Sequence, residues 1–178
     1  VDNFSGISMK VLNDHIDKNF DVLLGSDVLN NFNYCIDLSK NNFVLLQKLN
    51  TNKNLIDIPL YFIMNIPAVN IEVDNKMIKA FLDTGAGISY INSEYVKNYR
   101  PIGEEDDFYP SYGRFITEIY ELPMYIGGKE FQMSFGVLPS LLENTLLQME
   151  VEVIIGHSFF NDNVSYFYPN RNRLLFLS

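Results

Sequence analysis

The chain has 178 residues, 47% hydrophobic and 20% charged, so it can bury a core and is not expected to be disordered throughout. The net charge of −9 argues against a nucleic-acid partner, because phosphate backbones are bound by Lys and Arg. A single cysteine excludes an internal disulfide framework and a cysteine-rich zinc site, and no apolar run is long enough to predict a membrane-spanning segment. We expect no metal and no cofactor, and the sequence does not indicate a compartment.

Hydrophobic residues recur at every second position in short segments separated by turn residues, which is typical of β-strands. The strands expected from this pattern, in chain order, are residues 68–74, 77–82, 121–126, 129–137, 151–155, 166–167 and 173–177. The first four form two hairpins, since turn residues lie between each pair. Short helices are expected at residues 93–98, 140–150 and 157–161. The sequence therefore predicts an all-β fold with short helices.

The chain contains a weak internal repeat. Residues 4–47 align without a gap on residues 135–178, at an offset of 131 residues. The pattern DVLLG at 21–25 matches EVIIG at 152–156, and each is followed by a short helical segment and a terminal hairpin. The repeat predicts two lobes of similar structure, the first of them incomplete. Residues 1–47 would be the C-terminal part of the first lobe, residues 48–57 a linker and residues 58–178 the second lobe.

One apolar strand runs directly into a polar, glycine-containing segment, residues 81–87 (FLDTGAG). In its simplest interpretation this is a strand-ending turn, in which an Asp accepts nearby backbone amides. The segment also resembles the catalytic motif of the retropepsin-like aspartic proteases, in which Asp-Thr/Ser-Gly follows a buried strand. The residues that match this motif are Asp83, Thr84, Gly85 and Ala86.

Two further segments resemble the same family. Its lobes end with two large apolar residues and a Gly that lead into a short helix, here Ile154, Ile155 and Gly156. Residues 109–115 (YPSYGRF) stand where the family has a flap hairpin over the substrate. Gly113 is the expected bend of this flap, and Tyr109 and Tyr112 are candidates to cover a bound peptide. The resemblance extends over about residues 58–178.

The resemblance implies a β-barrel lobe of the acid-protease kind and an aspartic endopeptidase acting on a peptide or protein. Two carboxylates held close share one proton, so that one activates water and the other protonates the leaving amine. Asp83 would be one of the pair, and the Thr84 hydroxyl would hydrogen-bond across the interface between lobes. Gly85 would donate its amide to the carboxylate, and Gly156 would let a strand pass close beneath the loop.

The sequence has only one Asp-Thr-Gly, so the second Asp must come from elsewhere. Two copies can each give one Asp83 across a two-fold axis, or an upstream lobe can supply it, as the repeat favours. The first lobe can also be degenerate. The family usually has Ser, Thr or Asp where this chain has Gly87, and Ser89 is a candidate to compensate. A non-catalytic peptide-binding or assembly module on the same fold is therefore the alternative function.

Other candidates are weaker. His157 is expected to be a surface or partly buried residue at the start of a helix, and Cys35 to be a small core residue within a strand rather than a nucleophile. Asp27 aligns with Ser158 rather than with Asp83, so it is no substitute for the second carboxylate. The acidic run at 104–107 is expected to be a solvated loop.

Overall fold

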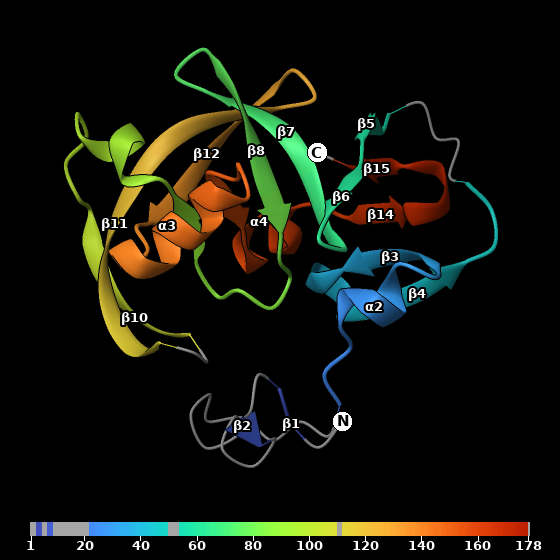
Figure 1. The fold of residues 1–178 in the computed structure, drawn as a ribbon. Helices are drawn as coiled ribbons and strands as arrows, with labels where there is room; N and C mark the ends of the chain where they lie inside the picture. Colours follow the sequence, from blue (N-terminus) through green and yellow to red (C-terminus); the bar gives the residue numbers. More distant parts are fainter. Residues whose placement is uncertain (1–2, 5–6, 9–21, 50–53, 110–111, 178) are drawn as a thin grey trace.

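The computed structural model describes residues 3–4, 7–8, 22–49, 54–109 and 112–177 (Figure 1). Strands between residues 61 and 155 form one eight-stranded sheet, in the order β10-β11-β12-β9-β13-β8-β7-β6. Its strands are β6 Tyr61–Ile63, β7 Ile66–Val73, β8 Lys76–Leu82, β9 Ser89–Ile91, β10 Gly103–Tyr109, β11 Gly113–Ile126, β12 Lys129–Gly136 and β13 Val153–Ile155. Strand β11 also pairs with β7, which closes the sheet into a barrel.

A second, five-stranded sheet has the order β4-β3-β14-β15-β5. Its strands are β3 Asn33–Asp37, β4 Asn42–Leu46, β5 Ile56–Pro59, β14 Ser165–Tyr168 and β15 Arg173–Phe176. Strand β5 begins inside the segment predicted to be a linker, and strands from both sides of that segment join in this sheet (Figure 1). A two-stranded pair, β1 Asn3–Phe4 with β2 Ile7–Ser8, lies near the N-terminus.

Helical segments are short. They are the α-helices α2 Ser26–Leu29, α3 Ser140–Gln148 and α4 His157–Asp162, and the 3₁₀ helices η1 Leu38–Lys40, η2 Ser93–Val96 and η3 Pro169–Arg171. Asn92 caps η2 as expected, because its side-chain oxygen accepts the amide of Glu94 at 2.9 Å. Within the described residues, no helix is both long and apolar enough to cross a bilayer. The predicted all-β fold class is confirmed.

The two hairpins expected from their turn residues are confirmed. Asp74 and Asn75 have φ angles of 50° and 60°, and Gly127 and Gly128 have 60° and 80°. Two consecutive left-handed residues form the type I′ turn, whose twist matches that of the flanking strands. At Gly127 space matters as well, because a Cβ there would overlap the side chain of Ile56. These turns set the register of the central barrel strands.

The prediction of a solvated loop at residues 104–107 is wrong, because these residues lie in β10. All seven residues of β10 pair with β11, from Gly103 opposite Ile119 to Tyr109 opposite Gly113. The acidic side chains at 104–106 are exposed, so backbone pairing forms this strand without any hydrophobic alternation. Because β11 pairs with β10, it also begins earlier than expected. It starts at Gly113, eight residues before residue 121, where hydrophobic alternation predicts its start.

An aromatic cluster joins the barrel to the second sheet. The ring of Phe159 in α4 packs edge-on against Phe131 of β12 and against Phe176 of β15, with both centroid distances 5.5 Å. Phe159 and Phe176 are fully buried. Helix α4 thus links the two sheets through one side chain, close to where β13 leaves the barrel.

We expect Phe159→Ala to lower the free energy of unfolding by about 3–5 kcal/mol, because it leaves a cavity where the two sheets meet. Phe32→Ala is the matched control, since that side chain is exposed and its loss should cost less than about 1 kcal/mol. Equilibrium denaturation of both variants measures the difference. Equal losses would mean that the cluster does not join the sheets.

Candidate active site

The loop after β8 presents a carboxylate at the surface. Asp83, Thr84 and Gly85 are exposed, although the strand that leads into them is buried. The Gly85 amide donates to Asp83 Oδ1 at 2.9 Å, and the Ala86 amide donates to the Asp83 carbonyl at 3.2 Å. The turn of the simplest interpretation is therefore present. It fixes one carboxylate oxygen of Asp83 and keeps the side chain accessible to solvent.

A second segment crosses beneath this loop. Strand β13 lies between β8, with which it runs parallel, and β9, with which it runs antiparallel. The Asp83 amide donates to the Ile155 carbonyl at 2.9 Å, and the His157 amide donates to the Ala86 carbonyl at 2.8 Å. A closed turn on its own does not require such a crossing, so the loop is more than the end of a strand.

Gly156 is required where the two segments cross. A Cβ at this position would lie 2.7 Å from the Ile88 carbonyl oxygen and 2.8 Å from that of Ala86. Both neighbours are backbone atoms of the loop, so neither can move aside without moving Asp83. The glycine therefore determines how closely the strand passes beneath the carboxylate.

Ser89 stabilises the crossing. Its side chain is buried, and its Oγ accepts the Gly156 amide at 2.9 Å and lies 3.4 Å from Ser158 Oγ. The sequence suggested that Ser89 compensates for Gly87 by bracing the Asp83 carboxylate. These two contacts instead connect Ser89 to the crossing segment.

The hairpin formed by β10 and β11 extends from the same barrel, and its tip contains the three residues expected in a flap. Tyr109 and Tyr112 are exposed, the Tyr112 amide donates to the Tyr109 carbonyl at 2.9 Å, and Gly113 has a φ of 99°. Figure 1 shows the hairpin as a long projection at the edge of the barrel. The tip also includes residues 110–111, which lie outside the described residues.

Tyr90 connects this hairpin to the strand that follows the Asp83 loop. Its hydroxyl donates to the carboxylate of Asp107 in β10, and its ring packs against Phe115 of β11 with a centroid distance of 6.2 Å. Burial, followed by the hydrogen bond to Asp107, raises the pKa of Tyr90 well above its usual value. Sequence reasoning missed this pair, because neither residue belongs to a motif and 17 positions separate them.

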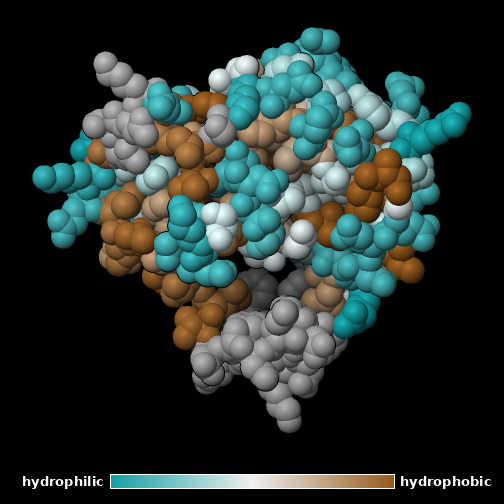
Figure 2. All heavy atoms as spheres, turned by 180° about the vertical axis from the view of Figure 1, so that it is seen from behind, coloured by the Kyte–Doolittle hydropathy of each residue, from teal (hydrophilic) through white to brown (hydrophobic). Residues whose placement is uncertain are grey.

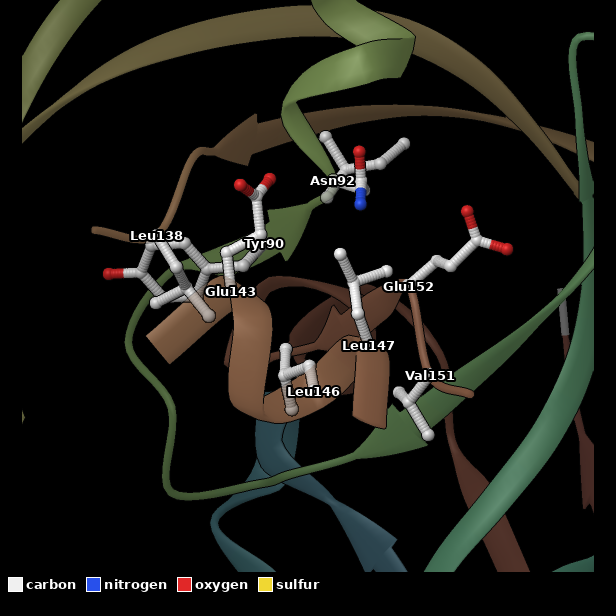
Figure 3. Close-up of a pocket in the computed structure, with 9 residues that line it drawn as sticks. Tyr90, Asn92, Leu138, Glu143, Leu146, Leu147, Val151 and Glu152 are labelled. Atoms are coloured by element: carbon white, nitrogen blue, oxygen red, sulfur yellow. The ribbon is translucent and has the colours of Figure 1, made fainter. Parts of the chain in front are cut away.

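Two hollows in the described part of the structure adjoin β9 or η2, and neither includes the Asp83 loop. A cavity of about 10 Å³, the room of about one water molecule, lies between α3 and β9 and is lined among others by Tyr90, Glu143 and Leu146 (Figure 3). Glu143 belongs to the supporting structure, because it accepts the Ser93 amide at 2.6 Å. An open hollow of about 540 Å³ lies between η2 and β11.

No group of three or more His, Cys, Asp or Glu that could hold a metal ion occurs among the described residues. His157 is exposed at the start of α4, and Cys35 lies half-buried in β3. Burial raises the pKa of the Cys35 thiol, with a smaller contribution from Asp37. A raised pKa keeps the thiol protonated, which is unfavourable for a nucleophile.

No protein-family model and no curated protein matches this chain. Among solved structures it is similar to a retropepsin-like aspartic protease from Rickettsia conorii, with 19% identity, a TM-score of 0.47, and 74% of this chain and 96% of that one covered. It is also similar to the simian foamy virus protease, with 18% identity and a TM-score of 0.39 over 51% of this chain and 88% of that one. A third similar structure is the foamy viral protease-reverse transcriptase in complex with an RNA/DNA hybrid, with 24% identity and a TM-score of 0.41. That match covers 51% of this chain and only 11% of the foamy viral chain.

We expect Gly156→Ala to lower the free energy of unfolding by about 2–3 kcal/mol, since the added methyl group would overlap two backbone carbonyls of the Asp83 loop. Gly103→Ala is the control, because a Cβ there meets nothing within 4 Å. Chemical denaturation compares the two variants. A Gly156 variant as stable as the control would contradict the close crossing.

We expect Tyr90→Phe to loosen the hairpin at residues 103–119 at a cost of about 1 kcal/mol, without unfolding the barrel. Hydrogen exchange of that segment measures the change, and Tyr125→Phe, which removes an exposed hydrogen bond to Glu130, is the control. Because the pKa of Tyr90 is raised in the folded state, its contribution is fully present below about pH 10 and is lost as pH rises towards the folded pKa. The free energy of unfolding should therefore fall less steeply above pH 10 in Tyr90→Phe than in the wild type, and equal slopes would contradict the assignment.

Proposed function

We propose that this protein is an aspartic endopeptidase in which Asp83 and a second Asp together activate the water that hydrolyses a peptide bond. One observation carries the proposal: the exposed Asp83 carboxylate is held by the Gly85 amide in a loop that the Ile155–His157 segment crosses from beneath. This arrangement offers a fixed and solvent-accessible carboxylate, which is suited to general acid–base catalysis.

The mechanism needs a partner for Asp83. Two carboxylates placed close together cannot both ionise easily, so they hold one proton between them. The ionised one takes a proton from water as it attacks the carbonyl carbon, and the protonated one gives a proton to the leaving amine. The exposed Thr84 hydroxyl is free to contact the unit that brings the second carboxylate, which is either another copy or another lobe.

The substrate class is an extended peptide. Such a peptide would lie between the Asp83 loop and the hairpin of β10 and β11, held by hydrogen bonds of its main chain. Tyr109 and Tyr112 at the hairpin tip have the exposed rings needed to cover it. The connection from Tyr90 to Asp107 would then control how easily the hairpin opens.

A non-catalytic peptide-binding module on the same fold is the second candidate. It is favoured by Gly87, which has no side chain to brace the carboxylate, and by the contacts of Ser89 with Gly156 and Ser158. This candidate predicts peptide binding without cleavage at any pH, including when a second Asp is supplied.

We expect Asp83→Asn to reduce cleavage of a mixed peptide library by at least about 100-fold between acidic and neutral pH, since the amide cannot accept the proton of water. Asp162→Asn, which removes an exposed carboxylate from α4, is the matched control and should keep full activity. The thermal midpoint of Asp83→Asn should match that of the wild type. Cleavage that persists unchanged in Asp83→Asn would refute the aspartic mechanism, and peptide binding without cleavage even when a unit carrying the second Asp is supplied would favour the second candidate.

A further inference from the structure

Residues 22–46 and residues 153–177 fold alike. The elements α2, β3, η1 and β4 follow one another in the same order as α4, β14, η3 and β15. The spacing is that of the sequence repeat: Asn41 and Asn172, which are 131 positions apart, both end a 3₁₀ helix in the left-handed conformation, with φ angles of 51° and 53°. The two segments are therefore structural equivalents.

The two equivalent segments pair with each other symmetrically. In the second sheet Cys35 lies opposite Tyr166, its own equivalent, and Ile36 lies opposite Ser165. If each residue is replaced by its equivalent 131 positions away, the pair of Ile36 and Ser165 becomes the pair of Phe167 and Tyr34. That pair is observed on the other side of Cys35 and Tyr166. The register is thus unchanged by the exchange, so a local two-fold axis passes through the pair of Cys35 and Tyr166.

Burial breaks this symmetry. Residues 174–176 of β15 are 0%, 3% and 0% exposed, whereas the equivalent residues 43–45 of β4 are 48%, 49% and 56% exposed. Likewise Val153 and Ile155 of β13 are fully buried, whereas their equivalents Val22 and Leu24 are more than half exposed. The hydrophobic face formed by residues 22–24 and 43–45 is hereafter called the open face. In Figure 2 hydrophobic atoms gather on the side of the molecule where α2 and β4 lie.

The repeat shows what covers such a face. Strand β15 is covered by β5, and β13 lies between β8 and β9, so both are buried by the body of residues 56–136. Nothing within the described residues covers the open face in the same way. Because the residues of the open face are as apolar as their buried equivalents, they are suited to the same kind of neighbour.

We propose that the open face is the docking surface for a second β-sheet body equivalent to residues 56–136, which carries its own equivalent of the Asp83 loop. This body would stand before residues 22–46 in the polypeptide, in the same order as residues 56–136 stand before residues 153–177. Its loop would face Asp83 across the local two-fold axis. The role of this loop as the source of the second carboxylate rests on the proposed function.

A second copy of this chain cannot cover the open face in the way that residues 56–136 cover β13 and β15. In each copy the position between β8 and β9 is already filled by β13, and β5 is already paired with β15. A symmetric dimer in which the β14 strands of two copies pair is excluded as well, because that edge of β14 is paired with β3 of the same chain. The occupant must therefore be a body that lacks its own terminal strands.

Gly25 supports the same occupant. A Cβ at Gly156 would meet the backbone of the Asp83 loop, but a Cβ at the equivalent Gly25 would meet only the side chain of Asp27. A docked loop would supply the missing backbone neighbour. Its Asp amide would donate to the Leu24 carbonyl, as the Asp83 amide donates to the carbonyl of Ile155.

A tandem protein tests this inference. Residues 54–131 are fused in front of the intact chain, because residue 132 aligns with residue 1 at the offset of 131. We expect amide exchange at residues 22–24 and 43–45 to slow by roughly tenfold or more relative to the unextended chain, with no change in the hairpin at 123–132. The same fusion with Leu24→Glu is the control, and it should lose this protection.

The outcomes separate the docking surface from the catalytic proposal. Slower amide exchange at the open face, together with cleavage that disappears when either Asp83 of the tandem protein is replaced by Asn, supports the docking surface and the peptidase. Protection without cleavage supports the docking surface and contradicts the peptidase. A tandem protein that lacks protection, or that melts below the unextended chain, overturns the docking surface. An unextended chain that sediments as a dimer and shows Asp83-dependent cleavage also overturns it and leaves the peptidase standing.

Discussion

The passage of Gly156 beneath the Asp83 loop is the constraint on which the rest of the structure depends. The loop and the crossing segment share backbone hydrogen bonds, so neither can take its position without the other. Strand β13 must therefore enter between β8 and β9, and α4 must begin directly after Gly156. That start places Phe159 between the two sheets, so one close backbone contact sets both the exposed carboxylate and the junction of the sheets.

Much of the fold could be predicted from the sequence, because the signals are local. Hydrophobic alternation located the central strands, and the turn residues at 74–75 and 127–128 located the hairpins. Strand β10 could not be found in this way, since its residues 104–107 are acidic and its order comes from pairing with β11. Pairing across a sheet depends on the partner strand, which a local pattern does not contain.

The candidate site was predictable to a similar extent. The segment at 83–86 and the glycine at 156 were recognisable because motifs carry them. The roles of Ser89 and of the pair formed by Tyr90 and Asp107 were not, because each acts through a partner far along the chain. Such contacts follow from the closed barrel, which brings together segments that the sequence keeps apart.

The local axis between the two repeats has a consequence for how they can diverge. If the repeats were identical, the pairs on either side of Cys35 and Tyr166 would have to be the same. Here one side stacks Tyr34 on Phe167 at 4.7 Å, and the other sets Ile36 against the much smaller Ser165. A large pair on one side and a smaller pair on the other is possible only for repeats that differ in sequence. The contact between the repeats is therefore asymmetric, and each repeat is complementary to the other repeat rather than to a copy of itself.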